Sequence, residues 1–371
     1  LGHRLGREQA SSHKWLLQVK ADTAGQCAGT LDGSRSAAAR QPHREPGTGG
    51  PCPRLSSARE LRPETLCDIG VGMSRIWRKH TRRVLAKRII GEIREHPGNA
   101  GRVNTALLRA VGWQIRKRVV PQTSARIHAY GLDLRLPMAS GSLSNLHYFG
   151  EAFEWQAVNF VRAFCREGDV VVDAGANIGM FTYMACEVVG RTGRVVSFEP
   201  LSEAAMVIQA NAERNALSVE VHSLATSDAA GWATFTDDVD VSNSLTTDPA
   251  RPGRSTRRVR TGRIDAYVTS PVTLVKVDVE GAETQALRGC SGFVEGDYKP
   301  VIIAEIHDHS LRRLGTSRDE LIALLDGWGY VPVHYDVARR DIVQGAWKTS
   351  TADQICVPLS QIDDVRVRLQ G

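Results

Sequence analysis

Three charged residues, Lys276, Asp278 and Glu280, alternate with valines in the sequence VKVDVEG (275–281). In an extended chain, alternation places all three side chains on the same side of the strand. Burying three charges at the end of an otherwise apolar strand is costly unless the charges pair or take part in chemistry. An ion pair between Lys276 and a carboxylate is the structural explanation. The functional explanation is that these charged groups take part in chemistry at the reaction edge of the sheet.

A glycine-containing loop, DAGANIG (173–179), follows a second apolar strand and opens a helix. Its glycines allow the backbone to approach a ligand and the helix to pack closely on the strand. The loop lacks the GxGxxG spacing with which dinucleotide-binding proteins seat a pyrophosphate on a helix N-terminus. An acidic residue at the strand end favours a cationic or zwitterionic ligand, although Asp173 is also a good helix cap. The candidate ligand-binding residues in this loop are Asp173, Gly175, Ala176, Asn177 and Gly179.

Two further strand ends carry candidate ligand-binding residues. Glu199 and Pro200 end the run RVVSF (194–198), and Glu199 lies 20 positions after Gly179, where a carboxylate can accept both ribose hydroxyls of an adenosine. Ala225 and Asp228 follow the third strand, at the edge where open α/β sheets bind ligands, and Asp228 can accept a hydrogen bond from the adenine amino group. The structural alternatives are a surface glutamate and a turn-forming aspartate.

His307 follows the fifth apolar run in EIHDH (305–309) and competes with the carboxylates as a proton acceptor. Together with Asp278, this cluster is also a possible divalent-metal site. A solvated loop is the commoner structure for such a sequence, so we expect no metal.

The elements that position these residues alternate between helices and strands from residue 151 onward. We expect helices near 151–166, 179–189, 202–215, 282–289 and 317–328, and strands at 170–173, 194–198, 219–225, 273–278, 301–306, 330–335 and 354–359. An irregular insertion is expected at 237–262. Apolar, β-branched runs separated by helices predict an α/β fold with a doubly wound, mostly parallel sheet of about seven strands.

The N-terminal third of the chain is organised differently. Residues 1–72 lack apolar periodicity and are rich in Gly, Ser and Pro, so we expect them to be disordered or to lie upstream of a true start at Met73. Residues 73–130 predict a basic extension of two amphipathic helices, broken at PGN (97–99). An alternating run at 127–136 predicts a small β-hairpin. We expect the main domain at 131–371, with its core at about 150–360.

The positive charge is concentrated in the extension. The whole chain carries a net charge of +6, but residues 73–130 hold 14 basic and 2 acidic residues, whereas residues 131–371 hold 23 basic and 32 acidic ones. Such asymmetry predicts weak contact of 73–130 with an anionic surface, with a solvated helix face as the structural alternative. No aromatic residues interleave the basic ones in the pattern of a nucleic-acid interface, so no specific nucleic acid is expected. The oligomeric state is left open.

The seven cysteines show neither CxxC pairs nor zinc-ligand spacing, and we expect them to be reduced. No window reaches the roughly 18 to 20 apolar residues of a membrane span, and no signal-peptide core is present. These features predict a cytoplasmic protein.

From about residue 150 onward, the sequence resembles the FkbM family of methyltransferases. The resemblance rests on Gly168-Asp169, on the runs 171–179, 196–200 and 275–283, on Leu287-Arg288-Gly289 and on Ala304-Glu305-Ile306. It implies a class I, Rossmann-like fold, to which the predicted helices of 73–130 add an N-terminal helical extension, and S-adenosylmethionine as the cofactor. It also implies methyl transfer to a hydroxyl oxygen, commonly of a sugar, glycolipid or polyketide-type product.

The resemblance also implies roles for individual residues. The loop from Asp173 to Gly179 resembles the methionine side of the cofactor site, Glu199 the ribose ligand and Asp228 the adenine-side residue. Glu154 matches an acidic position in the helix before the first strand. The family's usual Leu-Asp-Asp before the fourth strand is Ile264-Asp265-Ala266 here, so one of its acids is missing.

Methyl transfer is an in-line displacement that depends on alignment and on exclusion of water. A hydroxyl group is a poor nucleophile at neutral pH, so we expect a general base. Asp278 or Glu280, oriented by Lys276, is the predicted base, and His307 is the competitor. A nicotinamide-dependent oxidoreductase and a non-catalytic metabolite-binding module with a basic arm are the alternatives from other classes.

Overall fold

The computed structural model describes residues 86–120, 122–236, 245, 256–296, 298–347 and 353–371. The chain divides into two units, Leu1–Thr65 and Leu66–Gly371, and every described residue belongs to the second unit. The predictions for 1–72, for 73–85 and for most of the insertion at 237–262 lie outside the described residues. Among the helices that are described, none is both long and apolar enough to cross a membrane.

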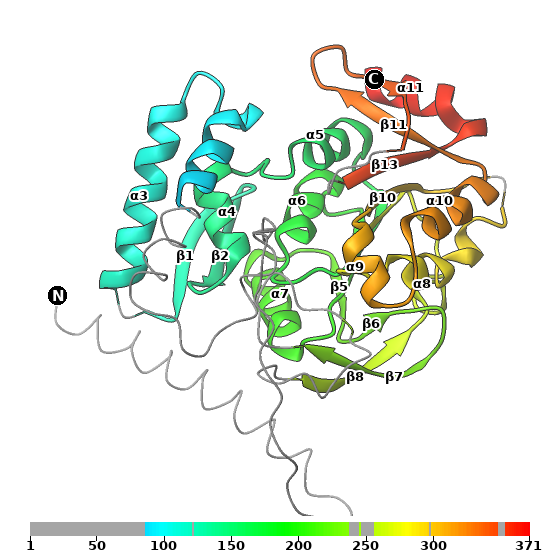
Figure 1. Cartoon of the computed structure of the whole chain (residues 1–371), viewed down its shortest axis with the longest axis horizontal. Helices are drawn as coiled ribbons and strands as arrows, with labels where there is room; N and C mark the ends of the chain where they lie inside the picture. Colours follow the sequence, from blue (N-terminus) through cyan, green and yellow to red (C-terminus); the bar gives the residue numbers. More distant parts are fainter. Residues whose placement is uncertain (1–85, 121, 237–244, 246–255, 297, 348–352) are drawn as a thin grey trace, which may run out of the picture. The chain divides into compact units, whose positions relative to one another are not determined.

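An eight-stranded sheet forms the centre of the described part (Figure 1). Its order is β12-β11-β13-β10-β9-β3-β4-β5. The strands are β3 (Val170–Ala174), β4 (Arg194–Phe198), β5 (Val219–His222), β9 (Leu274–Val277), β10 (Val301–Glu305), β11 (Tyr330–Asp336), β12 (Asp341–Gln344) and β13 (Asp353–Pro358). Strands β5, β4, β3, β9 and β10 are parallel neighbours. Strand β13 inserts antiparallel between β10 and β11, and β12 adds an antiparallel edge. The expected Rossmann-like α/β sheet is confirmed, with β12 as an additional strand.

Helices cover both faces of this sheet. They are α5 (Trp155–Phe164), α6 (Met180–Val189), α7 (Ser202–Asn215), α8 (Glu283–Arg288), α9 (Asp308–Arg313), α10 (Arg318–Gly327) and α11 (Ile362–Gln370). Along β3, Val171 belongs to one hydrophobic cluster with Phe160 of α5, whereas Val172 belongs to another with Leu287 of α8. Because each strand is buried on both sides, its sequence is a continuous apolar run rather than an alternating one.

The N-terminal elements join the same hydrophobic core. They are a helix at 86–95, η2 (Pro97–Asn99), α3 (Val103–Val119), β1 (Ser124–Ala129), β2 (Leu132–Pro137) and α4 (Gly141–Phe149), drawn in blue and cyan in Figure 1. Asn215 of α7 accepts a hydrogen bond from the backbone N–H of Asp133, which ties β2 to the main domain. The expected boundary between the N-terminal extension and the main domain, at residue 130, falls in the turn of this hairpin. Strands β1 and β2 therefore lie on opposite sides of that boundary although they pair with each other.

A small sheet of order β6-β8-β7 follows β5. Its strands are β6 (Ala225–Thr226), β7 (Gly231–Thr236) and β8 (Thr256–Gly262). The prediction of an irregular segment up to 262 is therefore wrong for β8. Its sequence TRRVRTG offers only Val259 to the buried side besides the terminal glycine, so the apolar alternation that signals a strand is nearly absent.

The remaining short elements are η3 (Ile264–Ala266), η4 (Ser291–Phe293) and η5 (Leu359–Gln361). The described cysteines form no disulfide bond and are buried: Cys165, Cys186, Cys290 and Cys356.

Candidate active site

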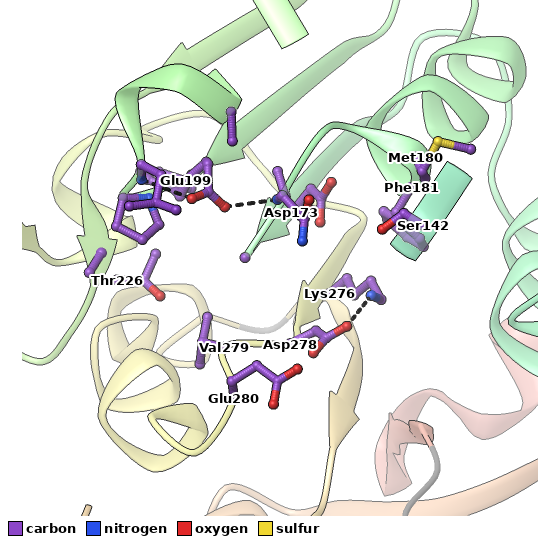
Figure 2. A pocket seen from close by; sticks show the side chains of 18 of the residues that line it. Ser142, Asp173, Met180, Phe181, Glu199, Thr226, Lys276, Asp278, Val279 and Glu280 are labelled. Atoms are coloured by element: carbon purple, nitrogen blue, oxygen red, sulfur yellow. Dashed lines mark hydrogen bonds and ion pairs between the residues drawn. The ribbon is translucent and has the colours of Figure 1, made fainter. Parts of the chain in front are cut away.

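A pocket of about 220 Å³ opens where the carboxyl ends of β3, β4 and β9 meet (Figure 2). Parallel strands bring these ends to one edge of the sheet, which explains why residues far apart in sequence share the pocket. The lining includes most residues predicted from the sequence: Glu154, Asp173, Gly175, Ala176, Asn177, Glu199, Pro200, Ala225, Lys276, Asp278 and Glu280. Gly179, Asp228 and His307 are not among the lining residues of the described chain.

Asp173, at the end of β3, is buried and has one unsatisfied oxygen. Thr182 donates a hydrogen bond of 2.6 Å to its Oδ2, whereas Oδ1 is buried without a hydrogen-bond partner among the described residues. Burial raises the pKa of Asp173, and the positive charge of Lys276 opposes that shift. A buried acceptor that lines a pocket and lacks a donor fits the ammonium group of a methionine moiety.

The loop after β3 approaches β9 so closely that a side chain is excluded at Gly175. Its φ is +89°, and a Cβ atom there would lie 1.8 Å from the backbone oxygen of Asp278. Gly179 has a φ of +90°, and its Cβ would lie 2.8 Å from the ring of Tyr183. Gly175 therefore shapes the pocket directly, while Gly179 allows α6 to pack beneath it.

Glu199, just past the end of β4, is buried, and backbone donors hold both of its carboxylate oxygens. Asn177 N–H donates to Oε2 and Leu201 N–H donates to Oε1, each at 2.8 Å. Each carboxylate oxygen can accept more than one hydrogen bond, so this fixed carboxylate can still receive two ribose hydroxyls. In Figure 2, Asp173 lies between Glu199 and Lys276 in the view into the pocket. The two acids thus suit the nucleoside and amino-acid ends of S-adenosylmethionine.

Asp228, which was predicted on the adenine side, does not line the pocket. Strand β6 ends at Thr226, and Asp228 lies exposed in the turn beyond it, where Ser227 Oγ donates to its carboxylate at 3.2 Å. Thr226 lines the pocket instead, and its hydroxyl oxygen is buried without a partner among the described residues. Thr226, two positions before Asp228, is therefore the polar candidate on the adenine side of the pocket.

The segments 137–153 and 237–262 were expected to contribute to the pocket, but the individual residues of its apolar walls and of α4 were not predicted. Apolar lining residues are Phe153, Met180, Phe181, Phe198, Leu201, Leu224, Phe235, Leu245 and Val279, and α4 adds Ser142 and Asn145. The motifs contained Phe198, Leu224 and Val279 but gave no sign that they face a ligand.

Lys276 is 3% exposed and sits among carboxylates at the end of β9. Its Nζ lies 2.8 Å from Asp278 Oδ2, 3.4 Å from Glu154 Oε2 and 5.3 Å from the centre of the Phe181 ring. Desolvation opposes its charge, but Asp278 and Glu154 outweigh it and hold the pKa of Lys276 well above its usual value. Burial raises the pKa of Glu154 to about 8, although Lys276 favours its ionised form.

Asp278, Glu280 and Glu305 form a carboxylate triad beside Lys276. One oxygen from each lies within 4.8 Å of the others. Burial, followed by the charge of Asp278, raises the pKa of Glu280 to about 7 and that of Glu305 to about 9. Glu280 is therefore able to take up or release a proton near neutral pH.

The triad is the one group of this kind found among the described residues, and its oxygens could share protons or hold a divalent cation. Neither His307 nor His309 belongs to it. His307 Nδ1 lies 3.0 Å from Ser310 Oγ, and the centres of the two imidazole rings are 6.2 Å apart. The histidine-containing metal cluster considered from the sequence is therefore not formed.

Glu305 and Asp353 were not predicted as part of this acidic region. They are paired across β10 and β13, and Asp353 raises the pKa of Glu305, of Glu154 and of Lys276. The sequence signals for Glu305 were its position at a strand end and its place in the family motif Ala304-Glu305-Ile306.

Comparison with known proteins identifies the family. The family model described as the Methyltransferase FkbM domain matches residues 173–332. The 31-O-demethyl-FK506 methyltransferase FkbM of Streptomyces tacrolimicus is 30% identical over 204 residues, which cover 45% of this chain and 75% of that protein. The chain belongs to the FkbM methyltransferase family. As a member, it is an S-adenosylmethionine-dependent methyltransferase rather than a nicotinamide-dependent oxidoreductase.

Other proteins are similar to parts of this FkbM-family chain. The AMB antimetabolite synthetase AmbE of Pseudomonas aeruginosa is 32% identical over 160 residues, 40% of this chain and 8% of that protein. A solved structure of Methyltransferase FkbM from Methylobacillus flagellatus aligns with a TM-score of 0.33 and 16% identity, covering 58% of this chain and 52% of the other. A putative rRNA-methylase from Clostridium thermocellum aligns with a TM-score of 0.34 and 14% identity, covering 54% and 92%.

Proposed function

We propose that this enzyme transfers the methyl group of S-adenosylmethionine to a hydroxyl oxygen of a small molecule or glycan, such as a sugar, a glycolipid or a polyketide-type product. The observation that carries the proposal is the position of Asp278 and Glu280 in the same pocket as the cofactor loop. A hydroxyl acceptor must lose a proton as its oxygen gains the methyl group, and these carboxylates offer a place for that proton. The name of the Streptomyces relative also refers to a methyl group on oxygen.

Different residues of the pocket have different roles in this reaction. Glu199 and Asp173 bind and orient the two ends of the cofactor, which supplies an electrophilic methyl carbon when bound. Lys276 holds Asp278 in place through their 2.8 Å ion pair. Glu280, whose pKa is about 7, is our preferred base, because it can be unprotonated yet still basic at neutral pH. The apolar walls exclude water from the reacting atoms.

Hydroxyl acceptors paired with amino analogues of the same scaffold test this proposal. We expect release of S-adenosylhomocysteine with a hydroxyl member of the panel and a product one methyl group heavier, with the methyl carbon bonded to oxygen. The matched amino analogue should react more slowly, because its ammonium form has no lone pair and would bind to the carboxylates as a cation. Methylation of the amino members alone would contradict an oxygen acceptor.

A further inference from the structure

Helix α3 exposes a row of large apolar side chains. Leu108, Val111, Ile115 and Val119 are 73%, 57%, 56% and 72% exposed. Their spacing of three or four residues places them along one side of the helix, which we call the apolar stripe. Single exposed apolar residues are ordinary on protein surfaces, but four in a row on one helix form a continuous patch.

The apolar stripe is not the face that attaches α3 to the protein. The buried residues of α3 are Ala106, Ala110 and Trp113, which lie on the opposite side of the helix at about 100° per residue. Trp113 stacks on His147 of α4 with ring centres 3.9 Å apart, and its indole N–H donates to Ser144 Oγ at 3.1 Å. Helix α3 is therefore fixed by one face and presents the other outward.

Basic residues border the apolar stripe, and α3 contains no acidic residue. Arg116 lies along one border and Arg118 along the other, as their helical positions require. Arg109 lies nearer the attached face and donates hydrogen bonds to the backbone oxygens of His147 and Tyr148 in α4. The other basic residues of this segment are Arg102 and Lys117. Within the described part of the chain, no carboxylate lies within ion-pair distance of any of these five cations.

We propose that the outward face of α3 lies on an anionic lipid surface, with the apolar stripe among the acyl chains near the headgroups and the arginines against the lipid phosphates. An amphipathic helix with an aliphatic face and a basic rim has the chemistry of such a surface. The stripe has no aromatic side chain on which nucleic-acid bases stack, which argues against a single-stranded nucleic acid. A second copy of α3 would bring two sets of cations together without acids to compensate them.

The proposed lipid-binding face is connected to the pocket through α4. One part of α4 packs on Trp113 of α3, while Ser142 and Asn145 of the same helix line the pocket. A membrane-bound α3 would therefore hold the pocket near the lipid surface. The proposal concerns where the enzyme works and does not depend on which atom it methylates.

Co-sedimentation of the full chain with vesicles tests the proposal. Vesicles of phosphatidylcholine mixed with phosphatidylglycerol are compared with vesicles of phosphatidylcholine alone. We expect binding to the mixed vesicles that weakens with salt. The double variant Leu108→Gln, Ile115→Gln should weaken it by at least about tenfold, because two apolar side chains no longer enter the bilayer. Arg116→Gln, Arg118→Gln should also weaken it by at least about tenfold and flatten the salt dependence.

A matched control is Val367→Gln, since Val367 is 72% exposed on α11 and should leave vesicle binding unchanged. The proposal is overturned if the wild-type protein does not bind mixed vesicles, if it binds neutral ones equally well, or if the stripe variant binds as tightly as the wild type. Sedimentation velocity supplies a further readout. Conversion of a dimer to a monomer by the stripe variant, without vesicle binding by the wild type, would assign the surface to self-association instead.

Discussion

The variant Glu280→Gln is expected to lower kcat/KM by about 10²- to 10⁴-fold, the usual contribution of a general base. The glutamine amide cannot accept the acceptor's proton. In the wild-type enzyme, kcat/KM should rise as the pH increases through about 7, because the base must lose its own proton and burial places the pKa of Glu280 there. It should level off above that pH. The measurement is a pH profile of both proteins with saturating S-adenosylmethionine, and the inflection near pH 7 should be missing in the variant.

Two further variants sharpen this test. Glu295→Gln is the control, because Glu295 is exposed and is not among the residues that line the pocket. It should behave as the wild type. Asp278→Asn should also lower turnover strongly, since it removes the partner that Lys276 holds at 2.8 Å. If Glu280→Gln and Asp278→Asn both keep full turnover, neither carboxylate is the base.

Lys276→Met is expected to lower the free energy of unfolding by about 3 to 5 kcal/mol at pH 9, the cost of leaving buried charges without their partner. The loss should be smaller at pH 6. Glu154 has a folded-state pKa of about 8, above the ordinary value of 4.5, so the folded protein binds more protons than the unfolded chain between these values. The contribution of Glu154 to the free energy of unfolding therefore falls as the pH rises through about 8. At pH 6 Glu154 is protonated, so the variant does not leave a buried carboxylate charge there without its lysine partner.

Urea unfolding of both proteins at pH 6 and pH 9 measures this difference. Lys299→Met is the matched control, because Lys299 donates a 2.7 Å hydrogen bond to the carbonyl of Trp328 instead of to carboxylates. Its effect should be smaller and should not depend on pH in this range. An equal loss at both pH values for Lys276→Met would contradict the proposed coupling to the carboxylates.

The central strands and the cofactor loop could be predicted because local sequence determines them. Strand β4 (194–198) and helix α7 (202–215) fall on the predicted residues, since an apolar run ends at Glu199 and Pro200 and an amphipathic pattern follows. The glycine loop could be predicted because only glycine suits position 175, where φ is positive and the backbone of Asp278 lies too close for a side chain.

The remaining part of the site depends on pairing between distant segments. Asp353 reaches the acidic region only because β13 inserts between β10 and β11. No local pattern in the sequence predicts the register that pairs Asp353 with Glu305. The sequence did not show that Thr226 lines the pocket and Asp228 does not, because the run 219–225 is divided between β5 and β6 and apolar content does not show where a strand leaves the sheet. The position of α4 at the pocket likewise depends on packing between segments that are distant in the sequence.

Parallel calorimetric titrations with S-adenosylhomocysteine and with NAD test most directly the claim that the pocket around Gly175 and Glu199 holds a methyl donor. We expect saturable binding of S-adenosylhomocysteine and none of NAD. We also expect that Glu199→Ala weakens the binding of S-adenosylhomocysteine by about 10- to 100-fold, because the ribose loses its charged acceptor. Binding of NAD with no binding of S-adenosylhomocysteine, or full affinity in Glu199→Ala, would contradict this claim.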